Sequence, residues 1–302
     1  MKQMVFILLI FCNFLEVGCF SKEQRKAPGV SQIQDIHGFI RIDGGLFTMG
    51  SPQKEIGRWS KGGPEDLRDI VIDSFYIAQY EVTQKEYFSI IKKEMPPTGN
   101  ENLPINQINW FEAIEFCNKL SELCGLEPAY NIFYDKIKYK PFVIYNEEVV
   151  YWNKDANGYR LPTSSEWECA IRAGTKTPFY TGKTISINQA NFGGDVFELN
   201  LMPIGSFEPN PWNLYDMAGN VYEWCWDWYP LGYKAAKIIR GGDSSSSMKD
   251  LRSAALSCSS PDNKSHGFRL ARNACNAGVV PRTENAGVTD NKFEEKSHNE
   301  DK

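Results

Sequence analysis

The 302-residue chain has few histidines, no close cysteine pair and no apolar run long enough to span a membrane. No Cys-x-x-Cys motif or cysteine–histidine cluster occurs, which argues against a structural zinc site. The net charge of −5 argues against non-specific nucleic-acid binding. No internal repeat of fixed period is present. These absences leave a globular protein whose composition is sufficient for a substantial core.

The longest apolar run lies at the N-terminus. Residues 5–15 are almost unbroken in apolar character, but a bilayer span needs about 20 such residues. With Lys2 before it, the run predicts a cleavable signal peptide over residues 1–18. It ends in LEVGC, which resembles a bacterial lipobox, although Glu16 stands where leucine is usual. We therefore expect an exported lipoprotein of the bacterial cell envelope, anchored to the membrane through Cys19; plain secretion is the alternative.

Composition divides the remainder of the chain into three parts. Residues 19–37 are polar and contain Pro and Gly, which is typical of a tether. Residues 273–302 are charged and poor in apolar groups, so we expect a disordered tail. Between them, residues 38–272 form one continuous domain.

Three helices are indicated by their capping residues. Thr83 with Glu86 predicts a helix starting at residue 84, and Thr163 with Glu166 predicts one starting at residue 164. Asn109 precedes a longer stretch of helical periodicity that Gly125 closes. Strand signals are short: residues 38–42, 70–82 and 149–152, the last followed by a predicted tight turn at 157–158. The chain is therefore expected to be α+β and rich in loops.

Residues 221–229 carry an unusual number of large rings. In an extended conformation, Tyr222 and the tryptophans at 224, 226 and 228 share one face, and Glu223 lies on the other. Such a stripe is typical of a buried core. Asn220 and Glu223 supply hard oxygen atoms beside a glycine, which fits either a calcium site or a turn Asn with a surface Glu.

Six cysteines remain after Cys12 and Cys19. Outside the cytoplasm some of them could pair, although the sequence does not give the connectivity. Cys117 and Cys124 lie two turns apart on one predicted helix, about 10 Å, which exceeds disulfide reach.

An ordered set of motifs resembles the sulfatase-modifying-factor family, that is, the formylglycine-generating-enzyme domain. The motifs are RLPTSSEWE, LYDMAGNVYEW, RGG and GFRLA, together with GGLFTMGSP and YIAQYEVTQKEY near the start of the domain. The resemblance covers residues 39–272. It implies a loop-rich C-type-lectin-like core, often stabilised by calcium, and it implies that Asn220 and Glu223 help to bind one such ion.

Active members of the family oxidise a substrate cysteine to formylglycine, using copper held by two thiolates after the RGG motif. Ser246 and Leu251 stand at those positions here, and Cys258 lies too far along to replace them. Hydroxyl groups do not substitute for thiolates on Cu(I). A related branch binds iron through histidines, and His37, His266 and His298 cannot build such a site. The sequence thus argues against copper and iron and against the oxidase, which remains the alternative function.

The competing prediction is a binding module for a protein or small-molecule ligand. In variable binding proteins of this fold, the segment after RGG presents the contact residues. Ser and Asp side chains offer adaptable hydrogen bonds on such a loop. The predicted contact residues are Asp243, Ser244, Ser245, Ser246, Ser247 and Arg252. A plain flexible loop is the alternative reading of DSSSS.

Overall fold

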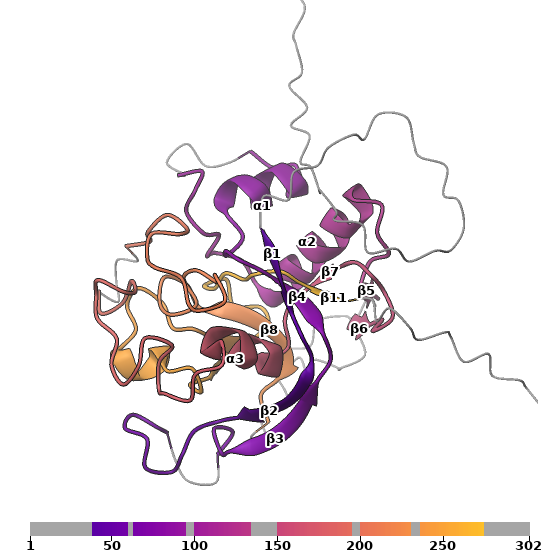
Figure 1. Ribbon diagram of the computed structural model, residues 1–302. Coiled ribbons are helices and arrows are strands. Elements are labelled where there is room, and N and C mark those ends of the chain that lie inside the picture. Colours follow the sequence, from indigo (N-terminus) through magenta and orange to yellow (C-terminus); the bar gives the residue numbers. More distant parts are fainter. Residues whose placement is uncertain are drawn as a thin grey trace, which may run out of the picture.

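The computed structural model describes residues 38–59, 63–94, 100–133, 150–194, 200–230 and 236–274. These residues hold three α-helices, one 3₁₀-helix and eleven short strands joined by long loops (Figure 1). The mixed, loop-rich architecture agrees with the sequence prediction. The predicted signal peptide and tether lie outside the described residues, as does the tail from residue 275. No helix within the described ranges combines the length and apolar character needed to cross a membrane.

The largest sheet brings both ends of the domain together. Its antiparallel order is β1-β4-β11-β7, formed by Phe39–Ile42, Phe75–Ala78, Ala271–Asn273 and Tyr159–Arg160. Ile77 is the register partner of both Ile40 and Ala271. The last strand therefore closes the sheet beside strands from the start of the domain, and it extends one residue into the predicted tail.

Three smaller sheets complete the strand set. β8 (Glu223–Trp228), β9 (Lys237–Arg240) and β10 (Ser257–Ser259) form an antiparallel sheet in the order β10-β9-β8. β2 (Gly45–Met49) pairs with β3 (Arg68–Ile72), and β5 (Tyr130–Ile132) pairs with β6 (Val150–Trp152). The predicted strand 70–82 is thus interrupted at residues 73–74. β6 does not pair with β7, so residues 157–158 do not close a hairpin between them.

The three predicted helices form where their capping residues indicate. α1 (Gln84–Ile91), α2 (Trp110–Leu123) and α3 (Ser164–Arg172) each begin with a reciprocal capping box. In each box the first side chain accepts from the N3 backbone, and the N3 glutamate accepts from the cap backbone. These bonds are local, so the helix starts are readable from sequence.

Two buried apolar clusters lie on opposite faces of β8. The first contains residues of α1 and α2 with Trp224, and the second contains residues of α3 with Cys225. The predicted alternation is confirmed at the centre of β8, because Trp224 and Trp226 contact the first cluster and Cys225 belongs to the second. Glu223 is buried with them and is not a surface residue.

Buried arginines hold the loops to this frame. Each pairs with glutamates that are distant from it in sequence or lie on a helix: Arg160 with Glu166, Arg172 and Arg240 with Glu168, Arg252 with Glu55 and Glu65, and Arg269 with Glu223. Removing one partner of such a pair typically costs about 3–5 kcal/mol. None of the described cysteines forms a disulfide.

Candidate functional site

The loop after β9 starts from two glycines in left-handed conformations. Gly241 and Gly242 have φ of +93° and +76°, which an L side chain rarely adopts. The buried Arg240 side chain holds the start of the loop in place through hydrogen bonds and an ion pair. Its guanidinium donates to Ser164 Oγ at 2.7 Å and to the carbonyl of Ala255 at 2.9 Å, and it pairs with Glu168. The RGG motif therefore makes a rigid turn.

Residues 243–247 are folded on themselves. Asp243 Oδ1 accepts from the backbone and hydroxyl of Ser245 and from the hydroxyl of Ser246, at 2.8–3.0 Å. Ser247 then caps the 3₁₀-helix η1 (Met248–Leu251) through Asp250. Local bonds of this kind stabilise turns built from Asp and Ser. The segment is an ordered turn, not a plain flexible loop.

This turn brings Ser246 and Leu251 together over Gly242. A Cβ placed on Gly242 would lie 2.8 Å from Leu251 Cδ1 and 3.3 Å from Ser246 Cβ. Ser246 is buried and Leu251 is fully buried. The two positions that resemble the copper ligands of the family are therefore neighbours in space, but they offer a hydroxyl and a methyl group. Neither a hydroxyl oxygen nor a methyl carbon is a suitable ligand for Cu(I).

Burial disfavours the thiolate form of three of the other described cysteines. Cys225 is fully buried, and burial raises its pKa well above the usual value. Burial likewise raises the pKa of Cys169 to about 11 and raises the pKa of Cys258. Within the described residues, no group of three or more His, Cys, Asp or Glu side chains is arranged so that it could hold a metal ion.

Arg252 does not belong to the contact surface, and its prediction as a binding residue was wrong. Its side chain is buried and donates to Glu55 and Glu65 at 2.8 Å and to the carbonyl of Gly57 at 2.9 Å. Sequence alone does not reveal this, because both glutamates lie more than 180 residues away. Arg252 instead ties the 52–59 loop to η1.

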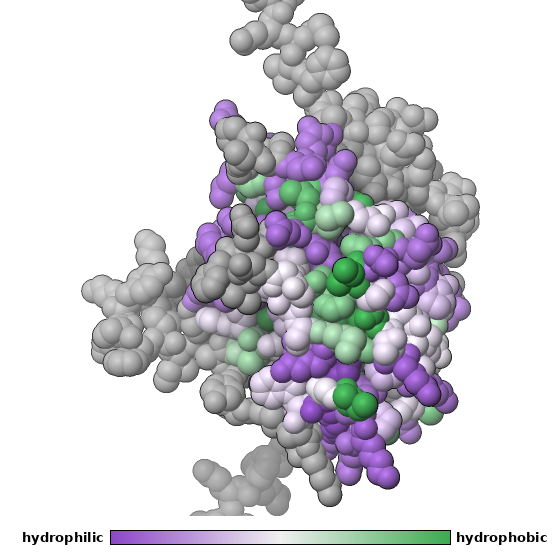
Figure 2. Space-filling view, turned by 90° about the vertical axis from the view of Figure 1, so that its left-hand side faces the viewer, coloured by the Kyte–Doolittle hydropathy of each residue, from purple (hydrophilic) through white to green (hydrophobic). Residues whose placement is uncertain are grey.

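The exposed part of the site is consequently the outer rim of two loops. Ser247 before η1 and Met248 and Lys249 on η1 are exposed, with Met248 at 43%. Ser244 and Ser246 are buried, so their prediction as contact residues was also wrong; the Ser246 hydroxyl is turned inward to Asp243. On the adjoining loop, Ile56 is 91% exposed and Trp59 is 73% exposed. The loops adjoin because a Cβ on Gly57 would lie 2.8 Å from Lys249 Cβ. Figure 2 shows apolar patches set among hydrophilic residues on the side of the molecule where these loops lie.

The contacts of Asn220 and Glu223 do not fit a calcium ion held between them. Both carboxylate oxygens of Glu223 accept from Arg269, and one also accepts from Trp167 Nε1 at 2.8 Å. Asn220 Oδ1 accepts from the side chain of Asn191 and the backbone of Met202. The candidate ligand oxygens are thus occupied by protein donors, and Arg269 already supplies the positive charge.

Two further acids lie beside this group, and sequence analysis missed them. Glu81 is fully buried, and its Oε2 accepts from Asn220 at 3.0 Å. Burial raises the pKa of Glu81 well above its usual value, with Asp216 and Glu223 adding to the effect. Burial also raises the pKa of Asp216 to about 6. Three carboxylates buried around one guanidinium make the ionised forms of Glu81 and Asp216 costly in the folded protein.

His266 is a packed residue. Its ring meets Trp224 edge-on at 4.7 Å, and neither ring nitrogen has a hydrogen bond within the described residues. Burial lowers the pKa of His266 to about 4, opposed in part by Asp243. The imidazole is therefore neutral at ordinary pH.

The tryptophan-rich strand encloses a cation that sequence analysis did not identify. Lys237 Nζ lies 3.7 Å from the ring centroid of Trp228, 4.0 Å from that of Trp110 and 4.8 Å from that of Trp226. It also donates to the Trp226 carbonyl at 2.9 Å. Cation–π contacts offset part of the cost of burying an ammonium group. The rings are thus a core that is built partly around the protein's own lysine.

Comparison with known sequences decides the family. The sequence model of the sulfatase-modifying factor enzyme 1-like domain matches residues 24–274. This chain belongs to that family. Its fold is the loop-rich α+β, C-type-lectin-like fold of the formylglycine-generating enzymes.

Relatives in this family carry different assigned roles. Chaperone protein LppX of Paenibacillus barcinonensis is 32% identical over 212 residues, 63% of this chain and 71% of that protein. The inactive C-alpha-formylglycine-generating enzyme 2 of Mus musculus is 26% identical over 232 residues, 67% of this chain and 72% of that protein. The solved structure of Treponema denticola variable protein 1 has a TM-score of 0.65 at 25% identity, covering 78% of this chain and 95% of that chain. Membership therefore does not by itself specify oxidase activity.

Proposed function

We propose that this family member is a binding module of the bacterial cell envelope and that it does not form formylglycine. One observation carries the proposal: Ser246 and Leu251 pack together on Gly242 at the positions that resemble the copper ligands. Catalysis through Cu(I) needs soft ligands at that point. A hydroxyl and a methyl group leave the site without them.

The proposed contact surface is the exposed rim of the two adjoining loops, which we call the 55–59/245–250 rim. Beneath it, Arg252 connects the loops through Glu55 and Glu65. Rigid support lowers the entropic cost of binding. Exposed Ile56, Trp59 and Met248 supply apolar anchors among polar groups. Aromatic and Met side chains of this kind are enriched at protein–protein interfaces, so a protein ligand is favoured over a small molecule.

The names of some relatives are compatible with this direction. One is described as inactive, one as a chaperone and one as a variable protein. None of these words describes an oxidase. Other relatives are formylglycine-generating enzymes, such as that of Streptomyces coelicolor at 27% identity, so the names allow a binding function but do not select it.

An aldehyde assay tests the absence of oxidase activity. Purified protein is incubated with copper, oxygen, a thiol reductant and a Cys-x-Pro-x-Arg peptide, and we expect no formylglycine by mass spectrometry. Aldehyde formation at a rate proportional to the protein concentration would overturn the proposal.

A gain-of-ligand variant tests the same geometry independently. Combining Ser246→Cys with Leu251→Cys should create a Cu(I) site, measured by competition with a chromogenic chelator. The matched control combines Ser247→Cys with Leu251→Cys, which places one thiol on the exposed side of the turn. Equal affinity in both variants would contradict the assignment of positions 246 and 251.

The envelope location rests on the N-terminal sequence. We propose that Cys19 carries the lipid anchor, and Cys19→Ala should move the protein from the detergent phase to the aqueous phase after temperature-induced phase separation. Unchanged partitioning would contradict anchoring through this residue.

A further inference from the structure

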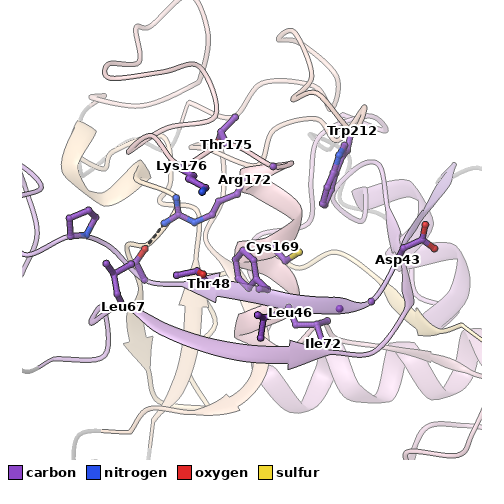
Figure 3. Close-up of a pocket in the computed structure, with 16 residues that line it drawn as sticks. Asp43, Leu46, Thr48, Leu67, Ile72, Cys169, Arg172, Thr175, Lys176 and Trp212 are labelled. Atoms are coloured by element: carbon purple, nitrogen blue, oxygen red, sulfur yellow. Dashed lines mark hydrogen bonds between the residues drawn. The ribbon is translucent and has the colours of Figure 1, made fainter.

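The described residues enclose a pocket of about 590 Å³ between the β2–β3 hairpin and the C-terminal end of α3 (Figure 3). Pockets that bind small molecules span roughly 300–1,000 Å³. None of its lining residues belongs to the 55–59/245–250 rim. It is therefore a feature separate from the contact surface proposed above.

Much of the pocket lining is apolar. Phe47 and Ile72 face it from the hairpin, whose two strands cross its floor in Figure 3. Trp212 stands at one end, where its backbone N–H donates to Asn210 Oδ1 at 2.9 Å. That bond fixes the backbone position from which the Trp212 side chain extends. A flat aromatic or an aliphatic group would fill this volume and cover the indole face.

Three charged residues line the pocket: Asp43, Arg172 and Lys176. Of these, Lys176 is the one whose charge is not neutralised by an ion pair within the described residues. It lies with Arg172 at the end opposite Trp212 (Figure 3), and no ion pair involves it within the described residues. Arg172 is buried and is neutralised by Glu168 at 3.0 Å. Asp43, the acid of the lining, forms an ion pair with Arg41. The remaining positive charge favours an anionic group on a bound molecule.

The hydroxyl of the neighbouring Thr175 is not available to a ligand. Thr175 Oγ1 is buried and has no hydrogen-bond partner among the described residues, and Thr175 also lines the pocket. An unsatisfied buried hydroxyl costs about 1–3 kcal/mol. This hydroxyl is closed off from the pocket, so it is not counted as a ligand contact and Lys176 is the polar anchor of the pocket.

We propose that this pocket binds a small amphipathic carboxylate. Its apolar body lies against Phe47, Ile72 and Trp212, and its carboxylate accepts from Lys176 Nζ. Two sources share this chemistry, namely acyl-chain carboxylates and aromatic carboxylates. The assignment does not depend on the binding function proposed for the rim.

Isothermal titration calorimetry on the full chain tests the proposal. The probes are decanoate, 2-naphthoate and, as the charge-reversed counterpart, decylammonium, all below their aggregation concentrations. We expect one or both carboxylates to bind at one site and decylammonium to bind at least about tenfold more weakly. Decanoate alone identifies the acyl source, and 2-naphthoate alone identifies the aromatic source.

Matched charge reversals locate the site. Lys176→Glu should weaken the bound carboxylate by at least about tenfold, whereas Lys183→Glu, at an exposed position outside the lining, should leave its affinity unchanged. Both side chains are exposed, so we expect both variants to fold. Their melting temperatures are measured to check this. The proposal is overturned if neither carboxylate binds, if decylammonium binds equally well, or if the two variants behave alike.

Discussion

Replacing Asp216 by Asn should make the folded protein more stable at neutral pH. Asp216 is 5% exposed, and its Oδ2 accepts from the Gly205 backbone at 2.6 Å. Its Oδ1 has no partner within the described residues. Burial is the main cause that raises its pKa, Glu223 adds to the effect, and the Gly205 bond and Arg269 oppose it. An Asn side chain retains an acceptor for Gly205 and cannot ionise.

The size of the effect follows from proton linkage. Burial raises the pKa of Asp216 from its ordinary value of 3.8 to about 6 in the folded protein, which corresponds to roughly 3 kcal/mol. Below about pH 4 the group is protonated in both states and has no cost. Between the two pKa values the folded state holds more protons, so stability falls as pH rises. At pH 7 the full cost is present, and the Asp216→Asn variant avoids it.

Urea unfolding from about pH 4 to pH 8 measures this. The variant should gain up to about 3 kcal/mol over the wild type at neutral pH and converge with it near pH 4. Glu81 is buried in the same group of acids and will leave some pH dependence in the variant. Asp155→Asn, at an exposed position, should change neither curve. A variant that is no more stable at neutral pH, or a difference that does not vary with pH, would refute the reasoning.

Three further outcomes follow from the buried charges. Glu223→Gln leaves Arg269 with a weakened partner in the core, so unfolding free energy should fall by about 3 kcal/mol or more; an unchanged urea midpoint would contradict that. Arg252→Met leaves Glu55 and Glu65 buried without their cation, so limited proteolysis should cut the 52–59 loop sooner than in the wild type, and equal cutting rates would show that the loop is held by other contacts. Because protein donors already occupy the candidate calcium ligands, a chelator should leave the melting temperature unchanged, and a fall on chelation would restore the ion site.

Local interactions explain which structural predictions succeeded. Thr83 with Glu86 and Thr163 with Glu166 cap helices through bonds three residues apart, so the pattern and the structure coincide. The alternation around Trp224 is likewise a property of any extended strand. Those features depend on neighbours in the chain, and they were readable without the fold.

Long-range contacts explain which ones failed. Arg252 reads as a loop residue, yet its partners Glu55 and Glu65 come from the other end of the domain. From the sequence, Glu223 is interpreted as a surface acid or a calcium ligand. In the structure it accepts hydrogen bonds from Arg269, which lies 46 residues away in the chain. Nothing in the local pattern specifies which distant charge will neutralise a side chain.

The amino-acid sequence by itself determined the family, the helix starts, the strand alternation and the absence of cysteine at positions 246 and 251, because each depends on residue identity or on spacing of a few residues. Tertiary structure alone decided that Ser246 and Leu251 meet over Gly242, that Arg252 is internal, and that Lys176 faces a pocket whose other charges are already paired. The physical reason is that burial and charge neutralisation are set by segments that fold together from distant parts of the chain.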